Sequence, residues 1–124
     1  MKVIICSPYN GTPEEIRRNV IIARALCLMA LDEGHVPFAP HLYFTQFFDE
    51  SDFDQRQRGI RCGLELMLGF DLLWIYAVNG ISDGMCQEAC RAKKLGLDYK
   101  EIDYIPLEYL ERAEALSLAG RVSV

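Results

Sequence analysis

The sequence has little histidine and no Cys-x-x-Cys pair, and these shortages argue against metal-binding proteins. Its 124 residues include two histidines, His35 and His41, which are not spaced as ligand pairs. Because zinc and similar ions are held by clusters of Cys and His at short spacings, we expect no metal site. The odd number of cysteines and their positions in expected strands and helices are typical of buried, reduced thiols. They are Cys6, Cys27, Cys62, Cys86 and Cys90.

Basic residues and long apolar runs are also scarce. Lys and Arg number 13 against 18 Asp and Glu, which gives a formal net charge of −5. Binding to a nucleic-acid backbone requires clustered basic side chains, so a nucleic-acid polymer is not an expected partner. The chain enters a short apolar strand at once, without a basic segment followed by a long hydrophobic stretch. We therefore expect neither secretion nor membrane insertion, and predict a cytoplasmic protein.

The chain does contain a regular alternation of strand and helix patterns. With 51% hydrophobic and 25% charged residues, it can bury one core, which predicts a single domain over residues 1–124. Strands separated by helices of this length imply right-handed crossovers and a parallel sheet covered on both faces. We predict an α/β, Rossmann/flavodoxin-like three-layer fold with four or five strands. The expected strands are 2–6, 35–39, 72–77 and 98–102, and the expected helices are 13–33, 52–69, 83–95 and 106–118.

Local signals support the first helix and its neighbours. Thr12 and Glu15 have the spacing of a capping box, with Pro13 at the first helical position, and Gly34 is expected to end the helix. Pro40 is expected to close the second strand. The stretch 41–50 is predicted to be an aromatic loop, either a lid that stacks on a flat ligand or a patch buried against the core or a second subunit.

Three loops should meet at the carboxyl ends of the strands, where parallel sheets bind ligands. They are 7–11, 40–47 and 78–84. The first, Ser7-Pro8-Tyr9-Asn10-Gly11, joins a strand to a helix N-terminus and could hold a phosphate or another anion, although a plain turn explains Asn10-Gly11 equally well. It has neither the Gly-x-Gly-x-x-Gly of dinucleotide folds nor the Lys of a P-loop. His41 could bind substrate or serve as a structural hydrogen-bonding group.

Glu88 has an unfavourable position in the helical pattern of residues 83–95, because its carboxylate falls among apolar side chains. At about 100° per residue, an apolar stripe forms on one side of the 83–95 helix and polar residues take the other side, Arg91 among them. The stripe consists of Met85, Ala89, Ala92 and Leu95. Glu88 falls on this inward stripe, behind the turn Ser82-Asp83-Gly84. A buried carboxylate must be partnered or have a shifted pKa, so Glu88 is either chemically active or part of a structural ion pair with an arginine.

Other polar residues near these loops have two readings each. Ser82 is a helix N-cap or a ligand contact, and Gly84 favours a ligand contact because it lets a ligand approach the backbone. The acidic residues between 49 and 54 are expected to cap the second helix. Cys86 and Cys90 could form a redox pair but are more often packing residues at this spacing. Arg58 and Arg61 could contribute positive charge to a site, with surface placement as the alternative.

Together these residues resemble the nucleoside 2-deoxyribosyltransferase superfamily over residues 2–102. The Ser-Pro-Tyr-Asn-Gly loop after a first strand, Asp71 before a later strand, and Ser82-x-Gly84-x-x-x-Glu88 at a helix start carry the resemblance. The spacing is closer to the 2-deoxynucleoside 5-phosphate N-hydrolases, and the whole chain looks most like small, largely uncharacterised bacterial and phage relatives. The resemblance implies that Glu88 is a nucleophile, and that residues 7–11, Ser82 and Gly84 surround the sugar and its 5-substituent.

The resulting prediction is cleavage or transfer of the N-glycosidic bond of a nucleoside or nucleoside 5-monophosphate, with Glu88 and Asp83 as catalytic residues. Asp71 and Tyr9 are alternative proton donors. Residues 7–11, His41, Ser82, Gly84 and Met85 are the expected substrate contacts. We expect no cofactor, a small-molecule partner, and a homodimer or higher homo-oligomer. The alternative is a nucleotide-binding or sensing module that has the same pocket without catalysis.

Overall fold

The computed structural model describes residues 1–118, which form an α/β fold around a four-stranded parallel sheet, as predicted. The strand order is β2-β1-β3-β4, and β1 and β3 are the two central strands. The strands are β1 (Lys2–Cys6), β2 (Val36–Phe38), β3 (Leu72–Ile75) and β4 (Asp98–Glu101). The helices are α1 (Pro13–Asp32), α2 (Pro40–Tyr43), α3 (Phe53–Leu66), α4 (Asp83–Leu95) and α5 (Leu107–Leu118), with short 3-10 turns η1 (Phe44–Gln46) and η2 (Met67–Gly69).

The sheet has a separate apolar core on each face because side chains alternate along each strand. Val3, Ile5 and Trp74 are buried on the α1 side. Ile4, Cys6, Leu73 and Ile75 are buried on the other side, with Met67 and with Met85 and Ala92 of α4. Central strands that are covered on both faces need apolar residues at consecutive positions. This requirement explains why β1 and β3 read as continuous hydrophobic runs rather than as alternating ones.

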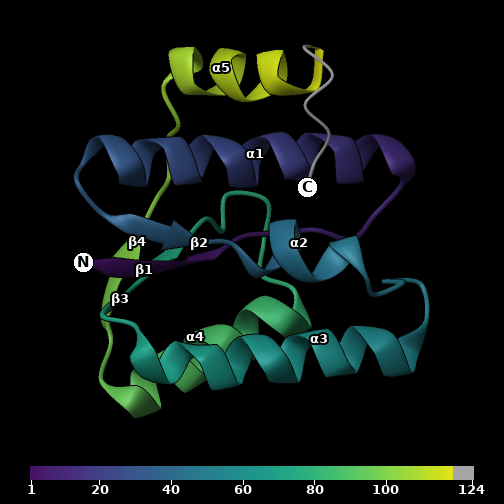
Figure 1. Ribbon diagram of the computed structural model, residues 1–124, viewed down its shortest axis with the longest axis vertical. Helices are drawn as coiled ribbons and strands as arrows, with labels where there is room; N and C mark the ends of the chain where they lie inside the picture. The colour runs from purple at the N-terminus through teal and green to yellow at the C-terminus, as the bar shows by residue number, and fades with distance from the viewer. Residues whose placement is uncertain (119–124) are drawn as a thin grey trace.

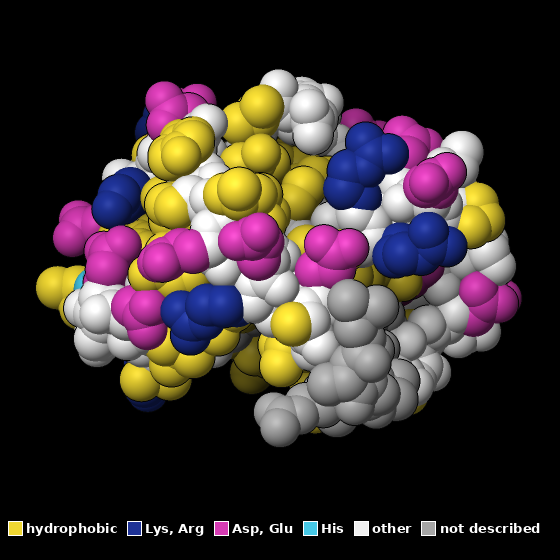
Figure 2. Space-filling model, turned by 90° about the horizontal axis from the view of Figure 1, so that it is seen from above, with side chains coloured by type: hydrophobic (Ala, Val, Ile, Leu, Met, Phe, Trp, Pro, Cys, Tyr) yellow, Lys and Arg dark blue, Asp and Glu magenta, His cyan; other side chains and the backbone are white. Residues whose placement is uncertain are grey.

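The helices stack in layers about the sheet. Figure 1 shows α1 on one side of the sheet and α3 and α4 on the other, with α5 on the outer side of α1. The predicted three layers are therefore present, and α5 adds a fourth. Ile105 and Ala113 join the α1 core, and Asp32 at the end of α1 accepts hydrogen bonds from Tyr109 (2.8 Å) and Arg112 (3.2 Å). Figure 2 shows this outer face, where acidic side chains lie across the surface beside exposed hydrophobic ones.

The helix ends match the sequence signals closely. The Glu15 backbone N–H donates to Thr12 Oγ1 (3.2 Å), and the Thr12 N–H donates to Glu15 Oε1 (2.9 Å), which completes the predicted capping box. Ser82 caps α4 by accepting from the Met85 N–H (3.2 Å). Gly96 ends α4 at φ +76, a left-handed conformation that glycine adopts without strain.

The segment after β2 differs from the prediction. The strand β2 ends before Pro40, as expected, but Pro40 is also the first residue of the short helix α2, a position where its fixed φ is favourable and its missing N–H costs nothing. The expected loop is mostly helical, and η1 follows α2 directly. Its aromatic rings pack on one another: Phe44 contacts Phe38, Tyr43 and Phe48. Phe44 is buried, whereas Tyr43 and Phe47 are about half exposed.

Two further expectations about side chains are wrong. Cys86 and Cys90 of α4 are exposed rather than buried thiols, because α4 turns that side toward solvent. Arg91, expected on the solvent side, is half-buried and lies beside α3. Among residues 1–118, no helix has the length and apolar character needed to cross a membrane.

Candidate active site

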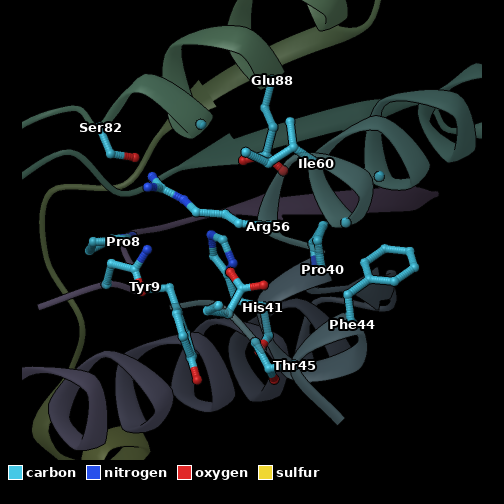
Figure 3. A pocket seen from close by; sticks show the side chains of 15 residues that line it. Pro8, Tyr9, Pro40, His41, Phe44, Thr45, Arg56, Ile60, Ser82 and Glu88 are labelled. Carbon is cyan, nitrogen blue, oxygen red and sulfur yellow. The ribbon is translucent and has the colours of Figure 1, made fainter. Parts of the chain in front are cut away.

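A cavity lies at the carboxyl ends of β1 and β2, at the edge of the sheet where the loops were expected to meet. Its volume is about 90 Å³, several times the 10–15 Å³ that one ordered water needs. Residues after β1, the α2–η1 segment, α3 and the start of α4 form its walls (Figure 3). The lining residues are Pro8, Tyr9, Asn10, Pro40, His41, Phe44, Thr45, Glu50, Arg56, Gly59, Ile60, Gly63, Ser82, Gly84 and Glu88.

Glu88 reaches the cavity from the second turn of α4 and is only 6% exposed. Its Oε1 atom is buried without a hydrogen-bond partner, and within the described residues the carboxylate has no ion pair. Burial raises the pKa of Glu88 to about 7, because removal from water disfavours the charged form. The neighbouring Cys6 thiol, which also donates to the Met85 carbonyl oxygen (3.7 Å), lowers that pKa by a smaller amount. Among residues 1–118, Glu88 is therefore not part of a structural ion pair with an arginine.

Arg56 of α3 supplies positive charge to the cavity. Figure 3 shows its side chain crossing the space between Glu88 and His41, with the guanidinium toward Ser82 and Pro8. Sequence reasoning had considered Arg58 and Arg61 instead, and neither lines the cavity. Arg56 precedes Ile60 and Gly63 by four and seven residues, so all three share one helix face. This spacing could have identified Arg56 from the sequence, but only if the inward face of α3 had been known.

Two glycines of α3 allow this helix to approach the aromatic segment closely. A Cβ atom on Gly59 would lie 3.2 Å from Phe48 Cδ2, tighter than ordinary packing. A Cβ on Gly63 would lie 3.7 Å from the Pro40 ring. The small residues therefore let the cavity wall form from α2 and α3 together.

His41 and Tyr9 stack on one another at the opposite wall. Their ring centroids are 5.3 Å apart with an interplanar angle of 26°. Burial, with help from the positive charge of Arg56, lowers the pKa of His41 to about 4, and a hydrogen bond with the Ser7 backbone opposes this effect. His41 is therefore neutral near pH 7. The Asn19 side chain donates to the Tyr9 carbonyl oxygen (2.9 Å) and so anchors the loop after β1.

Glu50 is a second carboxylate in the cavity wall. Burial raises its pKa, and Arg56 acts in the opposite direction. The pKa of Tyr9 is raised mainly by burial and, to a smaller extent, by the negative charge of Glu50. Sequence reasoning assigned Glu50 to capping of α3, but the cap is Asp52, which accepts from the Gln55 N–H (3.1 Å).

The cavity brings together most of the predicted site residues. Pro8, Tyr9, Asn10, His41, Ser82, Gly84 and Glu88 line it. Ser7, Gly11, Asp83 and Met85 do not. Ser7 is buried at the start of the first loop, and its Oγ has no hydrogen-bond partner within residues 1–118. Met85 is fully buried in the core, and Asp83 is exposed.

Asp71, the alternative proton donor, lies at the opposite end of the sheet. It precedes β3 and accepts from the Lys2 backbone N–H (2.9 Å), so it fixes the start of the two central strands. Within residues 1–118, no three His, Cys, Asp or Glu side chains gather in a way that could hold a metal ion.

Comparison with known proteins gives a family match over most of the chain. A family described as a domain of unknown function, DUF7768, matches residues 1–102. The chain belongs to this family. The DUF7768 match spans all four strands and every cavity residue, whereas α5 lies beyond it. A search of curated proteins found no match.

A solved structure shares the fold. It is a 2-deoxyribosyltransferase from the psychrotolerant bacterium Bacillus psychrosaccharolyticus, with 21% sequence identity and a TM-score of 0.57. The similarity covers 88% of this chain and 80% of that chain. At this level of identity, the likeness establishes the α/β architecture that this DUF7768 member shares with that enzyme.

Proposed function

We propose that this protein cleaves or transfers the N-glycosidic bond of a nucleoside or nucleoside 5-monophosphate, with Glu88 as the nucleophile. One observation carries the proposal: a buried carboxylate with an unpartnered oxygen lines a cavity at the ligand-binding edge of a parallel sheet. The fold shared with a 2-deoxyribosyltransferase supports a sugar substrate.

The reaction follows from the chemistry of a carboxylate beside an anomeric carbon. A Glu88 oxygen bonds to that carbon while the C–N bond breaks. The electron pair of the C–N bond leaves with the base, which takes up a proton. Water or a second base then attacks the same carbon and releases Glu88. The positive charge that develops on the sugar is stabilised more strongly by a carboxylate in a dry cavity than in water.

The other cavity residues support particular roles. The Arg56 guanidinium, close to the N-terminus of α4 and the loop after β1, favours an anionic substituent such as a 5-phosphate. Tyr9 and Glu50 are the cavity-lining groups able to donate a proton to the leaving base. Asp83, the donor expected from the sequence, is exposed and does not line the cavity.

A turnover assay tests the proposal directly. The purified protein is incubated with ribo- and deoxynucleosides and their 5-monophosphates, with and without an acceptor base, and free or exchanged base is measured by chromatography. We expect turnover of at least one substrate, reduced at least about a hundredfold by Glu88→Gln. Glu111→Gln, an exposed glutamate on α5, is the matched control and keeps full activity. No turnover of any substrate, or equal turnover by Glu88→Gln, contradicts the proposal.

The second candidate is a nucleotide-binding module without catalysis. The position of Asp83 outside the cavity lining favours this second function, because one of the two expected catalytic groups does not line the cavity. Calorimetry that shows saturable binding of a nucleoside monophosphate, with the ligand recovered unchanged, would support this function instead.

We also propose self-association. Tyr43, Phe47 and Leu66 are each about half exposed on one side of the molecule, near the cavity wall formed by α2 and α3. Light scattering coupled to size exclusion measures the mass; a monomer at 50 to 100 μM contradicts this expectation.

A further inference from the structure

A second concave site lies between α3 and α4, outside the Glu88 cavity. It is an open groove of about 540 Å³, which we call the arginine groove. Its lining residues are Arg58, Arg61, Cys62, Leu64 and Glu65 of α3 and Arg91 of α4. Figure 1 shows these two helices side by side on the same face of the sheet. No residue of the arginine groove belongs to the cavity lining.

The charge of the groove is opposite to that of the whole chain. Three guanidinium groups and one carboxylate line it, in a protein whose formal net charge is −5. Within residues 1–118, none of the three arginines forms an ion pair, although Glu65 lines the same groove. Like charges from two helices repel one another, and an anion bound between them would relieve this repulsion.

The three arginines differ in exposure. Arg58 and Arg61 are exposed, whereas Arg91 is half-buried and its Nε atom has no hydrogen-bond partner among residues 1–118, which costs free energy. The guanidinium carbon of Arg58 lies 5.8 Å from the centroid of the Phe48 ring, a cation–π contact at an exposed position. Guanidinium groups match the spaced oxygens of phosphate better than a single halide or a flat apolar ligand.

We infer that the arginine groove binds the phosphate groups of a small molecule, at a site separate from the Glu88 cavity. The inference is independent of the proposed function, because it uses no cavity residue. The open shape leaves space for several phosphates or for a phosphate chain with an attached nucleoside. The negative charge of the surrounding protein disfavours a nucleic-acid polymer.

Calorimetry at 100 mM salt, with inorganic tripolyphosphate and adenosine triphosphate as probes, tests the site and distinguishes a bare phosphate chain from a nucleotide. We expect saturable binding of at least one probe. The Arg61→Gln/Arg91→Gln variant should weaken it at least tenfold, which corresponds to about 1.4 kcal/mol. Glu65→Gln, which removes the one carboxylate of the groove, should strengthen it. Arg17→Gln/Arg18→Gln, with the same charge change on exposed positions of α1, should leave affinity within about twofold.

Three calorimetric results would overturn the inference. They are no saturable binding of either probe, equal weakening by the α1 control, and weakening by Arg56→Gln in the Glu88 cavity but not by the groove variant. A measurement on the unmodified protein guards against misfolded variants. Peptide-resolved thiol labelling should slow at Cys62, which lines the groove, and stay unchanged at the exposed Cys86 when a probe is bound. Labelling of Cys62 that is unaffected by a saturating probe also refutes the site.

Discussion

Replacing Glu88 with Gln should stabilise the protein, by an amount that depends on pH. The carboxyl group has a pKa of about 7 in the folded chain, against 4.5 for an ordinary glutamate. At about 1.4 kcal/mol for each pH unit between those values, the ionised form is disfavoured by about 3 kcal/mol in the folded state. The side chain is 6% exposed, so solvent screening does little to reduce this amount.

The sign follows from proton binding. Between pH 4.5 and 7, the folded chain retains a proton on Glu88 that the unfolded chain has lost, so the free energy of unfolding falls as pH rises through this window. Below pH 4.5 ionisation of Glu88 does not lower the free energy of unfolding, and above pH 7 it lowers it by the full amount. Glu88→Gln removes the titration, so its stability relative to the parent should rise with pH and then become level.

Urea unfolding of both proteins at several pH values between 5.5 and 8 measures this difference. We expect the advantage of Glu88→Gln to grow by about 2 kcal/mol across that range. Any fixed cost of burying the amide of the Glu88→Gln variant shifts the stability difference equally at every pH, so its dependence on pH is unchanged. Glu111→Gln, an exposed glutamate on α5, provides the control and should show no such growth. A difference between Glu88→Gln and the parent that stays constant with pH would refute the argument that burial raises this pKa.

Three further predictions follow from the same contacts. If Glu88 is the nucleophile, kcat/KM should rise as pH increases through about 7, since the ionised form attacks; a rate that falls through this pH would instead identify Glu88 as a general acid. Leu26→Ala should lower the free energy of unfolding by about 2 to 5 kcal/mol in urea titrations, because Leu26 is fully buried against the sheet, and a loss below 1 kcal/mol would show that the core collapses onto the gap. Thr12→Ala should lower the free energy of unfolding by about 1 kcal/mol in the same titrations, because it removes the cap of α1, and an unchanged unfolding midpoint would contradict this role.

Much of the fold could be predicted because its signals are local. The capping box at Thr12, the glycine after α4 and the apolar runs of β1 and β3 each depend on neighbouring residues, and each appears in the structure where expected. The helix that begins at Pro40 was not predicted, because a proline fits both the end of a strand and the first turn of a helix. Packing of the aromatic rings in η1 decides between these two outcomes, and that packing involves residues from other elements.

The candidate site divides in the same way. Glu88 could be found from the period of a single helix, since its neighbours on α4 define the inward stripe. Arg56 and Glu50 could not, because nothing in their local sequence shows that α3 and its preceding turn border the cavity. Asp83 was placed there by its closeness to Glu88 in sequence, but positions five residues apart on a helix point about 140° away from each other, and Asp83 is exposed.

The sequence by itself determined the order along the chain of the four strands and the four longer helices, the parallel sheet and an inward carboxylate on α4, because these depend on periodicity and end signals within short segments. Only the tertiary structure decided what surrounds that carboxylate. The pairing of β1 with β2 and β3 brings the loop after β1, the α2 segment and α3 together around Glu88. Its pKa is set by how much water this assembly excludes, a property of the packed chain rather than of any one segment.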